Sequence, residues 1–348
     1  MSQRAIPLAR TGVLLPFVRF LDDIGAPVEP LMENARLSPQ LLGWPEAVFP
    51  LHQGLEFIEA AANSQGVENL GLIVGQRTRI ADLRDLEQLL SPSMTLRAAL
   101  VLLVRTISLY NSGEVLALCC RSDQAILSHD FRFREAAGRR HGDVFTLMVI
   151  IDVIRLAAGP GWRPEAVSLC TSEASRKNLY EDALQTAVVF GPNRWAIFFD
   201  RQLLDEPLRY FRSLRRAAAN DPLEQLRRAA PADDFAGSLR QVILSLLPQG
   251  NPHIGIVARV ANLSTRTLQR RLAQANISHS RLLGEARLQM ALRLLRQPEI
   301  KITEVAFELG YSDASNFTRA FRRWTGSSPQ ATRRTLTGRA PQPARQEG

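Results

Sequence analysis

The sequence predicts an α+β domain at residues 1–207, followed by an all-α domain at residues 233–334 with two helix-turn-helix motifs joined by a linker helix. Three observations lead to this fold class. Strand-like and helix-like segments of the first part do not alternate regularly, which favours α+β over α/β. From residue 233 onward, the apolar residues follow helical spacing. Two segments of this second part also repeat each other, as in tandem helical units.

The first domain combines helical and strand patterns. Residues 50–63 and 94–110 have helical apolar spacing, and 143–158 form an apolar run that predicts a buried helix. VLALCCRSDQAILSHDFRF predicts two strands around a polar turn at Ser122 and Asp123. AVSLCTS and AVVFGPNRWAIFFD also have β character, with Gly191-Pro192-Asn193 as the turn.

Composition changes mark the ends of the domains. Residues 208–232 are charged and alanine-rich, which predicts a helical linker with a break near Pro231. Residues 335–348 are rich in Pro, Arg and Gly, which predicts a disordered tail. Beyond the linker, Asp233 or Asp234 can cap a helix that Pro248 and Gly250 would end. The apolar residues expected to face the core from this helix are Phe235, Leu239, Val242, Ile243 and Leu246.

The repeat relates residues 254–280 to residues 302–329. Ile254, Val257 and Ala258 match Ile302, Val305 and Ala306 at an offset of 48 residues. After one extra residue in the second turn, Leu268, Arg270 and Leu272 match Phe317, Arg319 and Phe321 at an offset of 49. Each copy predicts a short helix, a tight turn and a second helix, which together are a helix-turn-helix unit.

The second copy shows most clearly how its two helices should pack. Gly310 suits the C-terminal cap of the first helix because glycine adopts a left-handed backbone easily, and Asp313 can cap the second helix. One stripe of the second helix is apolar and should be buried: Phe317, Ala320, Phe321 and Trp324. The opposite face is then left to solvent: Ala314, Ser315, Thr318, Arg319, Arg322 and Arg323.

RLLGEARLQMALRLLRQ, between the copies, predicts a continuous linker helix. Leu288, Ala291, Leu292 and Leu295 should lie on its buried side. A rigid helix would hold the two recognition helices at a fixed separation, and successive major grooves on one face of DNA lie about 34 Å apart. Two such units in tandem are a far stronger indication of DNA binding than one, since single helical hairpins are common.

The charge distribution points to the same partner. The net charge is +9, and residues 249–348 hold 16 Lys and Arg against 6 Asp and Glu. Essentially all of the excess positive charge therefore lies in the helical domain, which favours a polyanion such as DNA over a generally basic surface. The sequence contains no apolar run long enough for a transmembrane helix. Its three cysteines (Cys119, Cys120, Cys170) indicate a cytoplasmic protein without a disulfide scaffold.

Residues 235–334 resemble the DNA-binding domain of the AraC/XylS family of bacterial transcriptional regulators. The resemblance is closest in EVAFELGYSDASNFTRAFRRWTGSSP. The first domain resembles, less specifically, the arabinose-binding-like N-terminal domain of one AraC subgroup through VVFGPNRWAIFFDRQLLDEPL, ENLGLIVGQ and LSPSMTLRAAL. Two positions depart from the family pattern. Thr332 replaces a usual aromatic residue, and Gly284 in the linker helix should lower helix stability by about 1 kcal/mol.

The resemblance implies which residues contact DNA. The first recognition helix would be Ser264–Leu272, with Leu268 and Leu272 inward. Six side chains would contact bases: Arg266, Gln269, Arg270, Ser315, Thr318 and Arg319. Four would contact phosphates: Thr265, Arg271, Arg322 and Arg323. Arg270 and Arg319 have a structural alternative, in which each holds the backbone or a neighbouring side chain.

The resemblance also implies a transcription regulator, with RNA polymerase and a second copy of the chain as possible partners. A small-molecule effector would bind the first domain, at residues that the sequence does not identify. Trp44, Phe57, Trp162 and Tyr180 are as consistent with a plain core as with a pocket. No cofactor is expected. Activation cannot be told from repression in these residues, although the family resemblance favours an activator.

Two other functions remain alternatives, and a third, an enzyme, is disfavoured by the motifs. An enzyme is not expected, because His52, His129, His141 and the cysteines lack metal-ligand spacing and no nucleophile or phosphate-loop motif is present. A nonspecific nucleic-acid-binding protein would have basic residues without differentiated base-reading positions. A redox or alkylation sensor would use a reactive thiol. Packing is the favoured role for Cys119 and Cys120, since one neighbour in a strand should point inward and the other outward.

Overall fold

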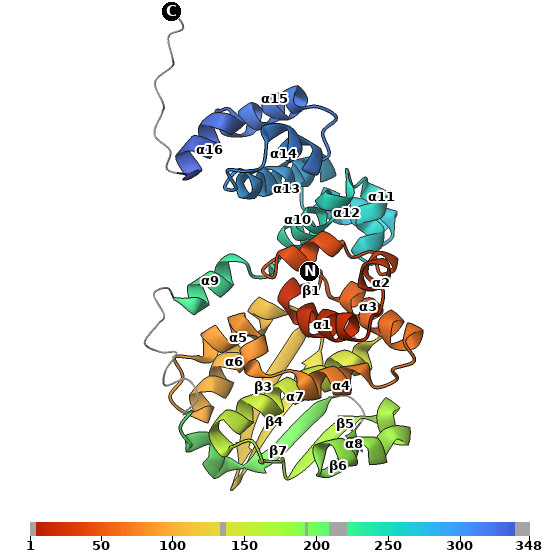
Figure 1. Ribbon diagram of the computed structural model, residues 1–348, viewed down its shortest axis with the longest axis vertical. Helices are drawn as coiled ribbons and strands as arrows, with labels where there is room; N and C mark the ends of the chain where they lie inside the picture. Colours follow the sequence, from red (N-terminus) through yellow and green to blue (C-terminus); the bar gives the residue numbers. More distant parts are fainter. Residues whose placement is uncertain (1–4, 133–136, 192–193, 209–220, 338–348) are drawn as a thin grey trace, which may run out of the picture. The chain divides into compact units, whose positions relative to one another are not determined.

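The computed structural model describes residues 5–132, 137–191, 194–208 and 221–337 (Figure 1). The predicted turn at Pro192-Asn193, residues 209–220 of the predicted linker and residues 338–348 of the predicted tail lie outside the described residues. The chain divides into two compact units: an α+β unit, Pro7–Pro231, and a helical unit that contains Ala232 onward together with the chain up to Ile6.

The α+β unit contains a two-stranded and a five-stranded sheet. The small sheet pairs β1 (Leu8–Arg10) antiparallel with β2 (Val48–Pro50). The large sheet has the order β3-β4-β7-β5-β6, in which only β5 and β6 are parallel. Its strands are β3 (Glu114–Arg121), β4 (Gln124–Phe131), β5 (Ala166–Cys170), β6 (Ala187–Gly191) and β7 (Trp195–Asp200).

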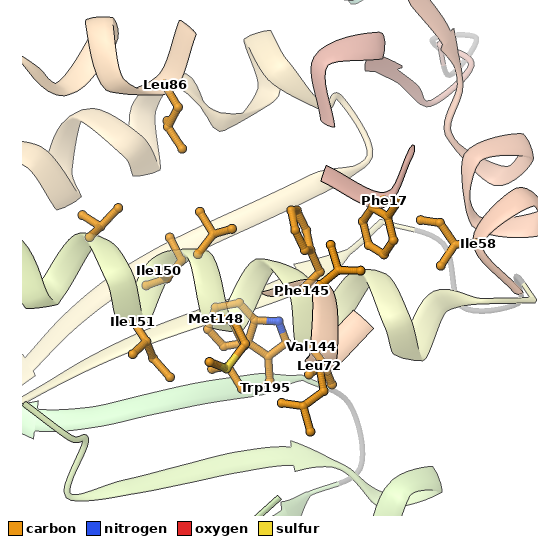
Figure 2. Close-up of a cluster of buried hydrophobic side chains, with 14 of the residues drawn as sticks. Phe17, Ile58, Leu72, Leu86, Val144, Phe145, Met148, Ile150, Ile151 and Trp195 are labelled. Carbon is orange, nitrogen blue, oxygen red and sulfur yellow. The ribbon is translucent and has the colours of Figure 1, made fainter. Parts of the chain in front are cut away.

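Helices pack on the buried face of the large sheet, whose strands β4 and β5 alternate between buried and half-buried residues, and one continuous apolar core results. Figure 2 shows part of that core, where Phe145 and Met148 of one long helix pack near Phe17 and Trp195. The α-helices of this unit are α1 (Leu15–Asp23), α2 (Val28–Asn34), α3 (Leu51–Ser64), α4 (Leu70–Arg77), α5 (Arg84–Leu90), α6 (Leu96–Tyr110), α7 (Arg139–Ala158), α8 (Lys177–Leu184) and α9 (Pro222–Arg228).

The predicted α+β class is confirmed. The longest apolar patterns in the sequence also correspond to the helices and strands that they predicted. The helices expected at 50–63 and 94–110 are α3 and α6, and the two strands around Ser122 are β3 and β4. The buried helix begins at Arg139, four residues before the predicted start. The strands on either side of the Gly191 turn do not pair with each other, because β5 lies between β6 and β7.

The packing role expected for Cys119 and Cys120 is wrong, because both side chains are exposed. Alternating burial requires a strand that is covered along its whole length. β3 is an edge strand, and these two residues lie at its end, beside the turn at Ser122. The amino-acid sequence of a strand does not reveal whether the strand lies at the edge or in the middle of its sheet. Cys170, on β5, is half-buried.

The helical unit contains the predicted tandem units. Its α-helices are α10 (Phe235–Leu246), α11 (Ile254–Val260), α12 (Thr265–Gln274), α13 (His279–Leu294), α14 (Ile302–Glu308), α15 (Ala314–Thr325) and α16 (Pro329–Thr337). Asp234 is the residue that caps α10, since its Oδ1 accepts a hydrogen bond from the Gly237 N–H at 2.8 Å. The chain near its start also belongs here, because the Ile6 N–H donates to Ser238 Oγ at 3.0 Å. α16 continues to Thr337, so residues 335–337 of the predicted disordered tail are helical.

The linker helix α13 forms as predicted, but the prediction of its buried face was only partly correct. Ala291 and Leu295 are buried, whereas Leu288 and Leu292 are only half-buried. The buried side instead follows a four-residue repeat through Leu282, Ala286, Met290 and Leu294. α13 packs on α10, and that contact decides which side of α13 is buried.

Candidate nucleic-acid interface

The two recognition helices, α12 and α15, begin in the same way. Ser264 Oγ accepts a hydrogen bond from the Thr267 N–H at 3.1 Å, and Asp313 Oδ1 accepts one from the Asn316 N–H at 2.7 Å. These hydrogen bonds satisfy N–H groups that the helix itself leaves without acceptors. The hydrogen bond from the Asn316 N–H also holds the pKa of Asp313 below its usual value, because the ionised carboxylate is the better acceptor.

The turns before these helices also match. Asn262 follows α11 with φ +54°, and Gly310 follows α14 with φ +74°. Both are left-handed conformations that end the preceding helix and redirect the chain. The equivalent turns are thus 48 residues apart and the equivalent caps 49 apart, as the sequence repeat requires.

Each recognition helix is anchored by one buried stripe. Leu268 and Leu272 are 0% and 5% exposed on α12. On α15, Phe317 and Phe321 are fully buried with their ring centres 5.6 Å apart, while Trp324 is only half-buried. The inward stripes fix the rotation of both helices, so the opposite face must point to solvent.

Most of the side chains predicted to contact DNA lie on these outer faces. On α12, Thr265, Arg266, Gln269 and Arg270 are exposed. On α15, Ser315, Arg319, Arg322 and Arg323 are exposed, and Thr318 is half-buried. Arg266, Gln269 and Arg270 correspond to Ser315, Thr318 and Arg319 at the offset of 49.

Arg271 differs from its neighbours. It is half-buried, and its guanidinium carbon lies 5.2 Å from the centre of the Phe235 ring on α10. Sequence reasoning had grouped it with the phosphate contacts. The guanidinium lies over an aromatic ring in the core of the helical unit, a geometry in which the aromatic face attracts the cation.

Asn316 is a residue that sequence reasoning missed. Its amide oxygen accepts a hydrogen bond from Arg319 Nη2 at 2.6 Å, and its amide nitrogen donates to the carboxylate of Asp313. The helix cap therefore connects through Asn316 to Arg319 and restricts the orientation of that arginine. This arrangement corresponds to the structural alternative for Arg319, in which a neighbouring side chain holds it.

Arg287 of the linker helix was also missed. Its guanidinium carbon lies 4.7 Å from the centre of the Tyr311 ring, and its Nη2 donates to Asn251 Oδ1 at 3.1 Å. A hollow of about 540 Å³ is lined by Arg287 together with Arg319 and Arg323. Three arginines from two helices around one hollow suit an anionic group. Their approach depends on the fold, because Arg287 is 32 residues before Arg319.

The α+β unit has a separate hollow, the central cavity, of about 670 Å³. It is lined by residues from β1, α1, α3, α5, α6, α7 and α9, including Arg10, Tyr110 and Phe145. None of the four aromatic residues named from the sequence (Trp44, Phe57, Trp162, Tyr180) lines it. Phe57 and Tyr180 are core residues, 0% and 3% exposed.

The described residues contain no group of three or more His, Cys, Asp or Glu placed to hold a metal ion. None of the helices in this part of the chain combines the length and the hydropathy that a bilayer crossing requires.

Comparisons with known proteins agree with both units. Residues 25–208 match the family model described as the arabinose-binding domain of AraC transcription regulator, N-terminal. Residues 257–335 match a helix-turn-helix domain model. The chain belongs to the AraC family of transcription regulators. Residues of the first model cover just over half of the chain, and the second model covers the tandem helical units.

This AraC-family chain matches some relatives over nearly the whole of both chains. It is 24% identical over 330 residues to the HTH-type transcriptional regulator VirS of Mycobacterium tuberculosis, covering 94% of this chain and 96% of VirS. It is 25% identical to the ornithine utilization regulator of Pseudomonas aeruginosa, covering 93% and 95% of the two chains. The crystal structure of the transcriptional regulator CdpR from Pseudomonas aeruginosa is 23% identical, with a TM-score of 0.45, covering 93% of this chain and 98% of CdpR.

Proposed function

We propose that this AraC-family regulator binds DNA sequence-specifically, with α12 and α15 each reading one segment of the major groove. One observation carries the proposal: two recognition helices of the same construction, each capped and anchored, present different polar side chains at equivalent exposed positions. A nonspecific binder needs positive charge but gains nothing from differentiated side chains at equivalent positions.

The base contacts in this proposal come from three positions in each helix. On α12, Arg266 and Arg270 suit guanine and Gln269 suits adenine, because each pairing can form two hydrogen bonds with one base edge. On α15, Ser315, Thr318 and Arg319 take the equivalent places. Arg319 would contribute the most selective contact of α15, since Asn316 already restricts its orientation.

The phosphate contacts come from the edges of the same surface. Thr265, Arg322 and Arg323 are exposed beside the base-reading positions. Arg287 joins them, because it lines the same hollow as Arg319 and Arg323. Arg271 and Arg287 each stack on an aromatic ring, but Arg271 does not line this hollow, so it is assigned to packing on Phe235 in place of a phosphate.

The regulatory part of the proposal places a small-molecule effector in the central cavity. The cavity volume of about 670 Å³ lies within the range of sites that bind small molecules. Effector binding would alter how the chain binds DNA and, in an activator, how it recruits RNA polymerase. A second copy of the chain would bind a symmetrical site, and a symmetrical selected motif would indicate such a dimer.

The test is selection of bound duplexes from a random DNA pool by the full-length protein. Arg266→Ala and Arg319→Ala are selected in parallel, with Arg228→Ala as the control because Arg228 is an exposed arginine of the other unit. The expected motif has two blocks about one helical turn apart. Each test variant should relax a different block, since a bidentate base contact contributes about 1–3 kcal/mol of discrimination.

Two results would contradict the proposal. Strong binding without any enriched motif, falling only with salt, would identify a nonspecific nucleic-acid-binding protein. A motif that neither Arg266→Ala nor Arg319→Ala changes would remove these two arginines from the base contacts.

A further inference from the structure

The central cavity has predominantly apolar walls. Figure 2 shows Phe17 and Phe145, whose ring centres lie 4.8 Å apart, with Ile58 beside them and Leu86 on another helix. These four side chains all line the cavity. Other apolar side chains of the wall are Leu14, Phe49, Leu55, Ile107, Phe131 and Val149. Such walls favour a ligand with an apolar body over a polyhydroxylated sugar, whose hydroxyl groups need hydrogen-bond partners on every side.

Arg10 brings a positive charge into this apolar setting. It is the last residue of β1 and only 5% exposed. Its Nη2 forms an ion pair with Asp85 Oδ2 at 2.9 Å. Its Nε and Nη1 have no hydrogen-bond partner among the described residues, although both atoms are buried. Asp85 is much more exposed, with 40% of its side chain open to solvent, so its charge is better screened than that of Arg10.

Tyr110 lies against Arg10, and its hydroxyl also lacks a hydrogen-bond partner among the described residues. The guanidinium carbon of Arg10 is 5.6 Å from the centre of the Tyr110 ring. The Tyr110 hydroxyl is buried and has no hydrogen-bond partner in the described part of the chain. Burial, with the nearby charge of Asp85, raises the pKa of Tyr110, so the hydroxyl keeps its proton and can donate it.

Two residues that line the central cavity therefore carry three buried donors without acceptors among the described residues: Arg10 Nε, Arg10 Nη1 and the Tyr110 hydroxyl. Buried polar groups are almost always paired in folded proteins, and an unpaired charged donor is especially unfavourable. An ionised carboxylate is an acceptor-only group, and its hydrogen bonds to a guanidinium are about twice as strong as those between neutral groups.

We propose that the central cavity binds a small apolar carboxylic acid, whose carboxylate accepts hydrogen bonds from Arg10 and Tyr110 while its hydrocarbon part packs against the phenylalanines. The inference rests on the proposed effector control and names the chemical class of that effector. Glu114 also lines the cavity, but its Oε1 already accepts a hydrogen bond from Asn111 Nδ2 at 2.9 Å. No hydrogen bond or ion pair joins Glu114 to Arg10 among the described residues.

One helix in the wall of the cavity, α9, could connect ligand binding to DNA binding. Gln225 of α9 lines the cavity, and its neighbour Leu226 is 4% exposed within the core. α9 ends at Arg228, three residues before the last residue of the α+β unit, Pro231. A ligand that changes the packing of α9 would thus act on the segment that leads into the DNA-binding helices.

The test measures binding of decanoate to the full-length protein by isothermal titration, below the concentration at which decanoate forms micelles. Methyl decanoate and decylamine are titrated beside it, since they keep the chain and change only the head group. Decanoate should bind, and the neutral ester and the cation should bind at least tenfold more weakly, because they lose the charge-assisted hydrogen bonds.

Two variants and two matched controls locate the head group. Tyr110→Phe should weaken decanoate binding by about tenfold, and Arg10→Gln by about 100-fold. Tyr180→Phe removes a hydroxyl outside the cavity, and Arg97→Gln breaks an Arg–Asp ion pair of 2.9 Å outside it. Both controls should stay within about threefold of the original affinity. Tyr110→Phe also covers the case in which Arg10→Gln does not fold, since it removes only an unpaired hydroxyl.

Three results would overturn the proposal: no binding of decanoate or of octanoate, equal binding of methyl decanoate, or unchanged decanoate affinity in Tyr110→Phe. DNA binding of the same protein samples is measured separately without any acid. If DNA binding fails there, the proposed regulator function is contradicted, while the titration still decides the ligand class.

Discussion

The guanidinium carbon of Arg271 lies 5.2 Å from the centre of the Phe235 ring, and this contact joins recognition helix α12 to α10. Arg270, the preceding residue, is exposed. Adjacent arginines on one helix point about 100° apart, so they can have different roles. One packs against an aromatic ring of its own domain, and the other is available to DNA.

Arg271→Ala should therefore destabilise the helical unit by about 1 kcal/mol, through lost cation–π attraction and lost packing of the aliphatic stem. Arg270→Ala is the matched control and should leave the unfolding temperature unchanged while weakening DNA binding. Thermal unfolding followed by circular dichroism measures the first effect. Identical melting of both variants would contradict the packing role of Arg271.

Two glycines of the helical unit should respond to alanine in opposite ways. Gly310 has φ +74°, and a Cβ there would lie 3.4 Å from the Asn251 backbone nitrogen. Gly284 lies inside α13, and a Cβ there would meet only Trp324 Nε1 at 3.7 Å, an ordinary contact. The left-handed conformation disfavours any side chain, whereas a helix interior favours alanine over glycine.

Gly310→Ala is expected to lower the free energy of unfolding of the helical unit by about 1–2 kcal/mol. Gly284→Ala should raise it by about 1 kcal/mol, because the alanine restricts the unfolded chain and fits the helix. Denaturant unfolding of the two variants side by side measures both changes. A destabilising Gly284→Ala would mean that the contact with Trp324 is tighter than the distance indicates.

Local patterns in the sequence were enough to predict α12 and α15. Caps such as Asp313, turns such as Gly310 and stripes such as Phe317 and Phe321 depend on neighbours within one helical turn. These predictions were confirmed because the local signals agree with the caps and the burial that the fold gives these helices. The same holds for α3 and α6, whose apolar spacing runs over several turns.

Contacts between segments that are distant in the sequence could not be predicted from these local patterns. Arg271 meets Phe235 only because α12 packs on α10, and Leu288 is half-exposed because α10 covers another side of α13. Cys119 is exposed because β3 lies at the edge of the sheet. The central cavity joins Arg10 to Gln225, which are too far apart in sequence for any spacing rule.

The exposed thiols give a direct test of the thiol-sensor alternative. Cys119 and Cys120 should react quickly with a thiol reagent in the native protein, and the half-buried Cys170 more slowly. Alkylation of the two fast thiols should leave DNA affinity unchanged, because they line neither the central cavity nor the recognition helices. Loss of DNA binding upon alkylation would favour a thiol sensor.

His129, in the α+β unit, is buried between two carboxylates. Its Nδ1 is 3.4 Å from Asp143 Oδ1 and its Nε2 is 3.7 Å from Glu114 Oε1. Neither contact meets hydrogen-bond geometry, so they are ion pairs. Burial lowers the pKa of His129, but the two carboxylates outweigh it and raise the pKa to about 9. The imidazolium also stacks on Trp195, at 5.0 Å between ring centres.

A histidine whose pKa rises on folding stabilises the protein fully below its unfolded pKa, near 6.5, and loses that contribution as pH rises through its folded pKa. The unfolding temperature should therefore fall between pH 6.5 and about 9. His129→Gln should remove this dependence and cost on the order of 3 kcal/mol at pH 6.5, since it removes the buried positive charge that lies between Asp143 and Glu114.

His52→Gln is the control for this pH series. Burial, and then the charge of Arg36, lowers the pKa of His52 to about 4, so its effect on stability falls mainly between pH 4 and its unfolded pKa near 6.5, below the tested range. Melting curves between pH 6.5 and 9 should therefore keep the slope of the original protein. An unchanged slope in His129→Gln would assign the dependence to other groups.

Asn316 and Arg322 should affect DNA binding in different ways, although both lie on α15. Asn316 Oδ1 accepts the hydrogen bond that restricts Arg319, whereas Arg322 is exposed beside the proposed phosphate contacts. Asn316→Ala would free the Arg319 side chain, so discrimination at the base that Arg319 reads should fall by about tenfold. Arg322→Ala should weaken binding to all duplexes and reduce the slope of log affinity against log salt by about 1.

Titrations of the selected duplex and of single-base variants, each at several salt concentrations, separate these two effects. Asn316→Ala should keep the original salt slope, because it removes no charge. Arg322→Ala should keep the base preferences, because a phosphate contact carries no sequence information. If Asn316→Ala changed the salt slope and left the base preferences intact, Arg319 would be a phosphate contact, and base reading by α15 would fall to Ser315 and Thr318.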